Sequence, residues 1–309
     1  MDDVILMTLQ EKEGVELIDL PEEWGGVIPL QVFIDEAKNL VSEGEKFGIH
    51  FRLLGGLAIR LHVQPHGLEE LYKSLKRLGD KVEITDIDGA ISYKHMKKTD
   101  KFMASKGYIK RKPTLSTAAS QRRIYVHPKN WWFIDCFYGI IKFNHDIELD
   151  DKRLKLDTPT LPLAELLLGK TQIVNMNYKD IVDTIMLLIP HKIGYSDQPE
   201  TINIEYIGKK YLKDGAFAWG FYHTVCTNLS NIKNHLAEFK ELDENQRTSI
   251  AAKIDEMLTY FENLPKNRGW KARAKIGTKT KWYRPVETTQ TVGEFRIFSG
   301  KQLLEKPRD

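Results

Sequence analysis

The first half of the chain mixes two hydrophobic periods. Residues 29–46 carry apolar side chains at helical spacing, and the following FRLLGG predicts a short buried strand ended by glycines. Two more helices are predicted by GLEELYKSLKRLG, which starts at Gly67, and by YKHMKKTDKFMASKG. Three strands are predicted by VEITDIDGAIS, RRIYVHP and NWWFIDCFYGI. We therefore expect a mixed α/β region built on a small sheet.

Beyond about residue 160 the pattern becomes helical. Four amphipathic helices are predicted by LPLAELLLGKTQIV, NYKDIVDTIMLLI, AFAWGFYHTVCTNLSNIKNHL and DENQRTSIAAKIDEMLTYFENL, the last with Asp243 as N-cap. The expected fold class is α+β, with a small mixed-sheet domain over residues 1–195 and a helical, bundle-like domain over residues 196–309. The first two of these helices are expected to pack back on the sheet. The last twenty residues are polar, which predicts a loose end.

Composition is typical of a folded globular protein. The chain has 309 residues, of which 41% are hydrophobic and 29% charged, and this length favours two domains. No apolar run approaches the roughly 18 residues that span a bilayer. Acidic residues flank the first apolar run, unlike the basic start of a secretory signal. We expect a cytoplasmic protein without membrane contact.

Several common chemistries lack support in the sequence. Cys136 and Cys226 lie in apolar surroundings without a CxxC motif, which indicates two core residues. The histidines His62, His66, His127 and His145 show no metal-ligand spacing, and neither GxSxG nor a P-loop occurs.

The segment KVEITDIDGA places two aspartates in an otherwise buried strand. Side chains alternate along a strand, so Asp86 and Asp88 share one face with Val82 and Ile84. Two close carboxylates resist joint ionisation unless a cation lies between them, and Mg²⁺ prefers oxygen ligands. The alternative is that the pair closes the strand at an Asp88-Gly89 turn.

Two further features accompany this pair. Gly55 and Gly56 stand where a strand ends and a helix begins, which lets backbone N–H groups approach a phosphate. Asp135 lies among apolar neighbours in a later strand. Because an unpaired buried carboxylate is unfavourable, this position indicates a bound cation or a catalytic role.

This order of strand, Gly-Gly, helix, Asp-x-Asp strand and third aspartate resembles the polymerase β-like nucleotidyltransferase superfamily. The next segment, LPLAELLLGKTQIVNMNYKDIVDTIMLL, is similar to the helical signature of AbiEii-type nucleotidyltransferase toxins, through Lys170 and Lys179-Asp180 with Asp183. The resemblance covers about residues 50–190. This chain departs from it in the glycine motif, which lacks a Ser after the first Gly, and in the added helix from Gly67.

The resemblance implies Mg²⁺-dependent transfer of an NMP from an NTP, with release of pyrophosphate. Asp86 and Asp88 would hold one or two Mg²⁺ ions, and Gly55 and Gly56 would cradle the triphosphate. Asp135 would share a metal or accept the proton of the attacking hydroxyl. Lys170 would contact the β- or γ-phosphate, and Asp180 would orient Lys170 or the base. Arg60 would meet the phosphates or serve only as a surface charge.

Charge distribution bears on the acceptor. The net charge is only +3, but residues 94–123 carry many cations, Arg122 and Arg123 among them, against the single acid Asp100. A second basic run, residues 266–284, contains no acid and carries Arg268, Trp270, Lys271, Arg273 and Trp282. Cations with aromatic side chains suit RNA, although each run alone also fits a solvated surface.

In the resembled toxins the acceptor is often RNA, notably the 3′ end of tRNA, and a cognate antitoxin protein is a further partner. RNA is therefore the first expected acceptor. Transfer to a protein or small-molecule hydroxyl and a degenerate nucleotide-binding module stay open as alternatives.

Overall fold

The computed structural model describes residues 19–285. The N-terminal run, predicted not to be a secretory signal, and the polar last twenty residues both lie outside this range. None of the helices within residues 19–285 combines the length and apolar character needed to cross a membrane.

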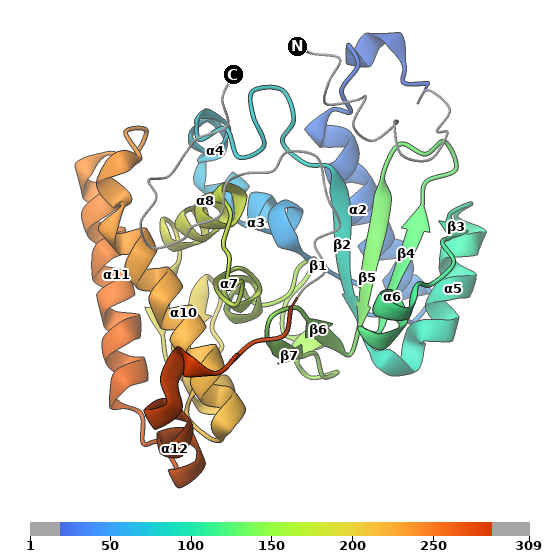
Figure 1. Ribbon diagram of the computed structural model, residues 1–309. Helices are drawn as coiled ribbons and strands as arrows, with labels where there is room; N and C mark the ends of the chain where they lie inside the picture. Colours follow the sequence, from blue (N-terminus) through green and yellow to red (C-terminus); the bar gives the residue numbers. More distant parts are fainter. Residues whose placement is uncertain (1–18, 286–309) are drawn as a thin grey trace.

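The first half of the protein is built around a mixed sheet with the strand order β1-β2-β5-β4-β3 (Figure 1). Its strands are β1 (Arg52–Leu54), β2 (Asp86–Ile91), β3 (Ile109–Lys110), β4 (Arg122–Val126) and β5 (Phe133–Tyr138). Only the central pair β2 and β5 is parallel, and the other neighbours are antiparallel. The parallel pair brings corresponding side chains of β2 and β5 to the same face of the sheet.

Helices flank this sheet and continue beyond it. They are α2 (Leu30–Lys46), α3 (Gly55–Val63), α4 (Glu69–Ser74), α5 (Met96–Ser105), α6 (Leu115–Ala119), α7 (Leu163–Thr171), α8 (Tyr178–Leu188), α9 (Ile204–Ile207), α10 (Ala216–Asn234), α11 (Glu244–Asn263) and α12 (Arg268–Ile276). Helices α3, α7 and α8 pack together, and α10 to α12 lie on their far side from the sheet (Figure 1). Helices α7 and α8 both contact α3, which itself packs against β1 and β2, so α3 lies between the two helices and the sheet.

Two short two-stranded sheets complete the fold. One pairs β6 (Ile140–Lys142) with β7 (Asp146–Glu148), and the other pairs β8 (Lys192–Gly194) with β9 (Thr201–Asn203) in parallel. The expectation of a purely helical second half is therefore wrong at β8 and β9. These strands have only three residues each, too few for a periodic pattern to appear in the sequence.

The boundaries of two predicted elements also differ. The strand expected from Val82 starts at Asp86, because Asp86 pairs with Phe133, the first residue of β5, and earlier residues have no neighbour in the ladder. The helix expected from Gly67 is reduced to α4, since Lys76 takes a φ of +47°, which no α-helical residue adopts. By contrast, Asp243 caps α11 in a capping box with Gln246, as predicted.

One continuous core links these elements. Buried apolar side chains from Phe33 to Leu264 belong to a single cluster, which includes Cys136, while Cys226 is partly buried against it. The mixed α/β class with a mixed sheet is confirmed. The division into residues 1–195 and 196–309 stays a prediction.

Candidate functional site

Three aspartates meet on one face of the central strand pair. Asp88 and Asp135 are direct register partners in the parallel pair β2 and β5. Asp86 lies two residues before Asp88 and so faces the same side. Asp135 is 5% exposed, which means that this carboxylate is held inside the protein.

Of the three carboxylates, that of Asp88 is the least favoured in its charged form. Burial and the negative charges of Asp86 and Asp135 raise the pKa of Asp88 well above its usual range, while Arg122 and Lys170 act to lower it. Among residues 19–285, no hydrogen-bond donor contacts this carboxylate. A bound cation would therefore stabilise it at neutral pH.

Asp135 already has a cation beside it. Arg122 donates from Nε to both carboxylate oxygens of Asp135 at 2.6 Å and also contacts it through Nη2. Burial still raises the pKa of Asp135, although the hydrogen bond and the charge of Arg122 act in the opposite direction. One of the three acids is thus partly neutralised by the protein itself.

Gly55 closes this site from the neighbouring strand. It follows β1, whose last residue Leu54 pairs with Asp88, and it opens α3 with a φ of +73°. A Cβ at this position would clash with Asp88 Oδ2. Glycine therefore allows the backbone at the start of α3 to lie directly against the Asp88 carboxylate.

A second polar cluster surrounds Asp183 on α8. Arg77 donates from Nε to Asp183 Oδ1 at 2.6 Å and from Nη2 to Oδ2 at 2.9 Å. Tyr72 donates its hydroxyl to the same carboxylate, and Lys170 Nζ lies 2.7 Å from Asp183 Oδ2 and 3.1 Å from Asp180 Oδ1. Burial alone would raise the pKa of Asp183, but Arg77 and Lys170 hold it well below its usual range.

This cluster adjoins the glycine pair. A Cβ on Gly56 would clash with the Arg77 guanidinium, so the missing side chain makes room for Arg77 beside the first turn of α3. The charge of Lys170 also acts on Asp88, which connects the two clusters electrostatically. The structure therefore brings together Asp86, Asp88, Asp135, Gly55, Gly56, Lys170 and Asp180, all of which the sequence singled out.

Three arginines that the sequence assigned to phosphate or RNA binding form contacts within the protein. Arg60 is 7% exposed, lies 3.1 Å from Glu83 Oε2 and covers the ring of Tyr72. Arg122 pairs with Asp135, and Arg123 pairs with Asp100. The sequence assigned Arg122 and Arg123 to an RNA surface, whereas the structure pairs each of them with an aspartate.

The second basic run lies on α12 and the segment after it. Trp270 donates Nε1 to Leu212 O, and Trp282 Nε1 lies 3.2 Å from Thr224 Oγ1. Arg273 donates to Gly277 O and Thr280 O and lies over the ring of Trp219. These contacts hold α12 and the segment after it in place and leave Trp270 and Trp282 partly buried.

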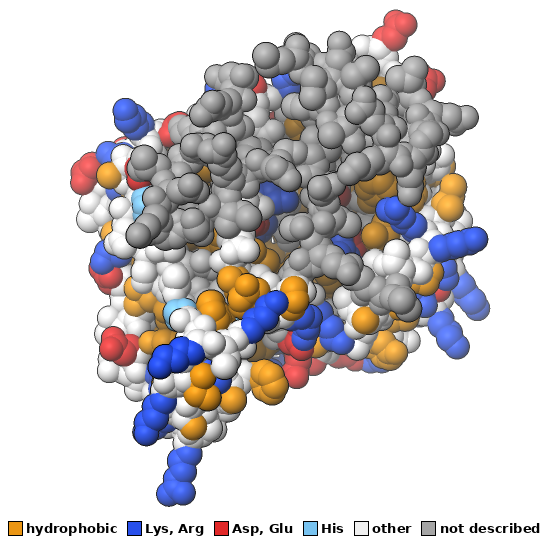
Figure 2. Space-filling view, viewed as in Figure 1, with side chains coloured by type: hydrophobic (Ala, Val, Ile, Leu, Met, Phe, Trp, Pro, Cys, Tyr) orange, Lys and Arg blue, Asp and Glu red, His pale blue; other side chains and the backbone are white. Residues whose placement is uncertain are grey.

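Other cations of the run face the solvent. Arg268 and Lys271 are exposed, and Figure 2 shows Lys and Arg side chains gathered over α12 at the lower left. The described part of the run therefore offers charge for phosphates more than aromatic faces for bases.

Two residues of the site were not predicted from the sequence. Tyr72 and Arg77 lie in and after α4, the segment by which this chain departs from the resembled pattern. Nothing in KSLKRLG distinguishes Arg77 from its basic neighbours. Only their contacts with Asp183 reveal them.

Comparison of the chain with models of protein families, with curated proteins and with solved structures gave no match.

Proposed function

We propose that the protein is a Mg²⁺-dependent nucleotidyltransferase that transfers an NMP from an NTP to an acceptor hydroxyl. One observation carries the proposal: Asp88 and Asp135 are register partners on parallel strands, and the backbone of Gly55 at the start of α3 lies against Asp88. Carboxylates and helix-start N–H groups are what a metal-bound triphosphate requires.

The donor chemistry of the site fits a hard divalent cation. Asp88 has a raised pKa and no hydrogen-bond donor among the described residues, and Asp86 supplies a second oxygen ligand on the same face. When bound, such ions supply the positive charge that stabilises the entering and leaving oxygens. Asp86 and Asp88 would hold these ions.

The remaining side chains would bind and orient the reactants. N–H groups at Gly55 and Gly56 would face the phosphates, with Arg77 as a nearby cation. Asp135 would accept the proton of the acceptor hydroxyl, whose oxygen bonds to the α-phosphorus as the bond to pyrophosphate breaks. Lys170 would reach a phosphate only by leaving Asp180 or Asp183, so in the described arrangement its role is to hold the site together.

RNA is the acceptor that we propose first, with tRNA 3′ ends as the specific class. The exposed Arg268 and Lys271 support this choice, because they supply charge for a phosphate backbone. A cognate antitoxin protein belongs to the same proposal.

The test is transfer of label from each α-³²P NTP, with Mg²⁺, to total tRNA and to protein alone. Asp88→Asn is compared with wild type, and Asp255→Asn is the control because Asp255 pairs with Lys233 on the exposed surface of α11. We expect labelled RNA with wild type and with the control, and none with Asp88→Asn. Labelled protein without labelled RNA would overturn the acceptor, and no label despite NTP binding would indicate a degenerate module.

A further inference from the structure

A group of metal-ligand side chains lies at the other end of α3 from the glycine pair. His62 is in the last turn of α3, His191 follows α8, and Glu200 precedes β9. One ligand atom from each lies within 4.8 Å of the other two. Sequence spacing predicted no histidine metal site, because His62, His191 and Glu200 are far apart along the chain.

The hydrogen bonds fix which ring nitrogen of His191 is free. His191 is fully buried, and its Nδ1 lies 2.7 Å from Leu187 O, which can only accept. Nδ1 therefore carries a proton, and in the neutral ring Nε2 holds a lone pair. Nε2 has no hydrogen-bond partner, although Glu200 Oε2 lies 3.3 Å from it.

This contact places a lone pair opposite a carboxylate oxygen. Such an arrangement is repulsive unless a positive charge lies between the two atoms. A proton on Nε2 would supply this charge and so would a metal cation, and the nearby His62 ring offers a metal a third ligand. A metal cation satisfies both atoms at once.

One ring nitrogen of His62 is also held by a hydrogen bond. Its Nε2 lies 2.7 Å from Thr160 Oγ1, which itself donates to Leu161 O. With the Thr160 proton on Leu161 O, Thr160 accepts from His62 Nε2, and the lone pair of His62 is left at Nδ1. Histidine ligands typically donate their second ring nitrogen to such a partner, which fixes the ring.

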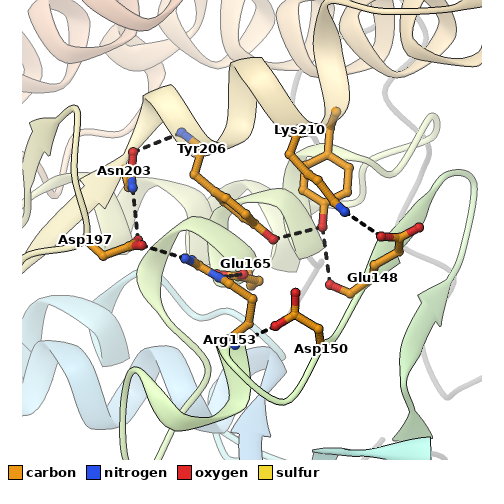
Figure 3. A network of polar contacts seen from close by, with 9 residues as sticks. Glu148, Asp150, Arg153, Glu165, Asp197, Asn203, Tyr206 and Lys210 are labelled. Atoms are coloured by element: carbon orange, nitrogen blue, oxygen red, sulfur yellow. Dashed lines mark hydrogen bonds and ion pairs between the residues drawn. The ribbon is translucent and has the colours of Figure 1, made fainter.

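The segment before Glu200 is anchored. Asp197 accepts from Arg153 Nη1 at 2.8 Å and from Asn203 Nδ2 at 3.0 Å, as Figure 3 shows. Glu200 O accepts from Lys192 N at 3.0 Å, and Glu200 has a φ of +55°, which is uncommon for a residue with a side chain. These contacts fix the backbone at Glu200, whose carboxylate lies near His191.

From this geometry we propose that His62, His191 and Glu200 bind one divalent transition-metal ion of the zinc class. Two imidazoles with a carboxylate suit Zn²⁺ and its neighbours, whereas Mg²⁺ prefers oxygen ligands alone. Three protein ligands leave a position open, and His62 and Glu200 line a cavity of about 350 Å³ from which a water or a small ligand reaches it. His66 Nε2 lies 2.8 Å from Glu200 Oε2 and is the competing partner of this carboxylate.

The experiment titrates the chelator-treated full chain with Zn²⁺ against a chromophoric zinc chelator, and with Co²⁺ by visible absorption. We expect one equivalent of Zn²⁺, a Co²⁺ d–d spectrum, and a Zn²⁺ affinity that Glu200→Gln or His62→Gln lowers at least about 10-fold. Glu205→Gln and His50→Gln are the matched controls, because each removes a comparable group that already has a salt-bridge partner.

Glu200→Gln is the decisive variant. The Glu200 side chain is half exposed, so its replacement preserves the fold even if His62→Gln does not. Asp88→Asn should leave Zn²⁺ binding unchanged, which separates this site from the acidic cluster. Absence of Zn²⁺ binding, or binding that Glu200→Gln does not weaken, would overturn the proposal.

Discussion

Arg77 and Asp183 form a two-point ion pair across 106 residues of sequence, from Nε and Nη2 of the arginine to the two carboxylate oxygens. The same pair fixes the position of α8 relative to the first turn of α3, because the Arg77 guanidinium occupies the space that a side chain on Gly56 would take. The ion pair thus connects the helical half of the protein to the glycine pair.

Replacement of Asp183 should therefore destabilise the whole fold. In Asp183→Asn the charges of Arg77 and Lys170 remain in place with one partner fewer, and breaking a buried ion pair costs about 3–5 kcal/mol. The free energy of unfolding in urea measures the effect. Asp255→Asn, which removes an exposed pair, should change it by at most about 1 kcal/mol. Equal losses in the two variants would contradict a structural role for Asp183.

Replacement of Asp88 should instead raise the free energy of unfolding, by an amount that depends on pH. Because its pKa is raised in the folded state, its contribution favours folding below the unfolded pKa of about 3.9 and is lost as pH rises through the folded pKa. Asp88→Asn should therefore be more stable than wild type at pH 8, by more than about 1 kcal/mol, and equal to it near pH 4.

Unfolding curves of both proteins across this range measure the difference. Added Mg²⁺ should narrow the gap at pH 8, because it stabilises only the protein that keeps the carboxylate. A gap that stays constant with pH would show that ionisation of Asp88 is not its source.

Gly55→Ala tests the close approach of α3 to the acids. The new Cβ clashes with Asp88 Oδ2, and the φ of +73° is unfavourable for alanine, so we expect a loss of about 1–3 kcal/mol and weaker Mg²⁺ binding. Gly169→Ala is the matched control, since Gly169 lies within α7 with nothing near its Cβ position. The control should be neutral or up to about 1 kcal/mol more stable. Comparable losses in both would show that Gly55 has no special role.

The elements that carry the acids were predictable because their signals are local. A strand alternates its side chains, so Asp86 and Asp88 share a face whatever surrounds them, and Gly55 and Gly56 mark a strand end in any context. The spacing of Lys170 and Asp180 likewise depends only on two neighbouring helices. These relationships need no knowledge of the tertiary fold.

Relationships between distant segments were not predictable. The register of Asp88 with Asp135 depends on the parallel pairing of β2 with β5, which no single-strand pattern specifies. Arg77 reaches Asp183 only because the helix from Gly67 stops early, at a left-handed residue that the sequence does not reveal. Likewise, His191 and Glu200 meet His62 through the β8–β9 connection, which lacks any periodic signal.

Substitution of the exposed cations on α12 tests RNA binding without disturbing the fold. Arg268 and Lys271 are exposed, and acidic residues are favoured in the first turns of a helix, so the double variant Arg268→Glu with Lys271→Glu should fold normally. Its affinity for tRNA, measured by fluorescence anisotropy, should fall at least about 10-fold, and the slope of log K against log salt should decrease by about 1–2. The double variant Lys38→Glu with Lys240→Glu makes the same change in net charge at exposed positions on α2 and just before α11. If both double variants lose affinity equally, the effect is one of net charge, and α12 is not the surface that RNA contacts.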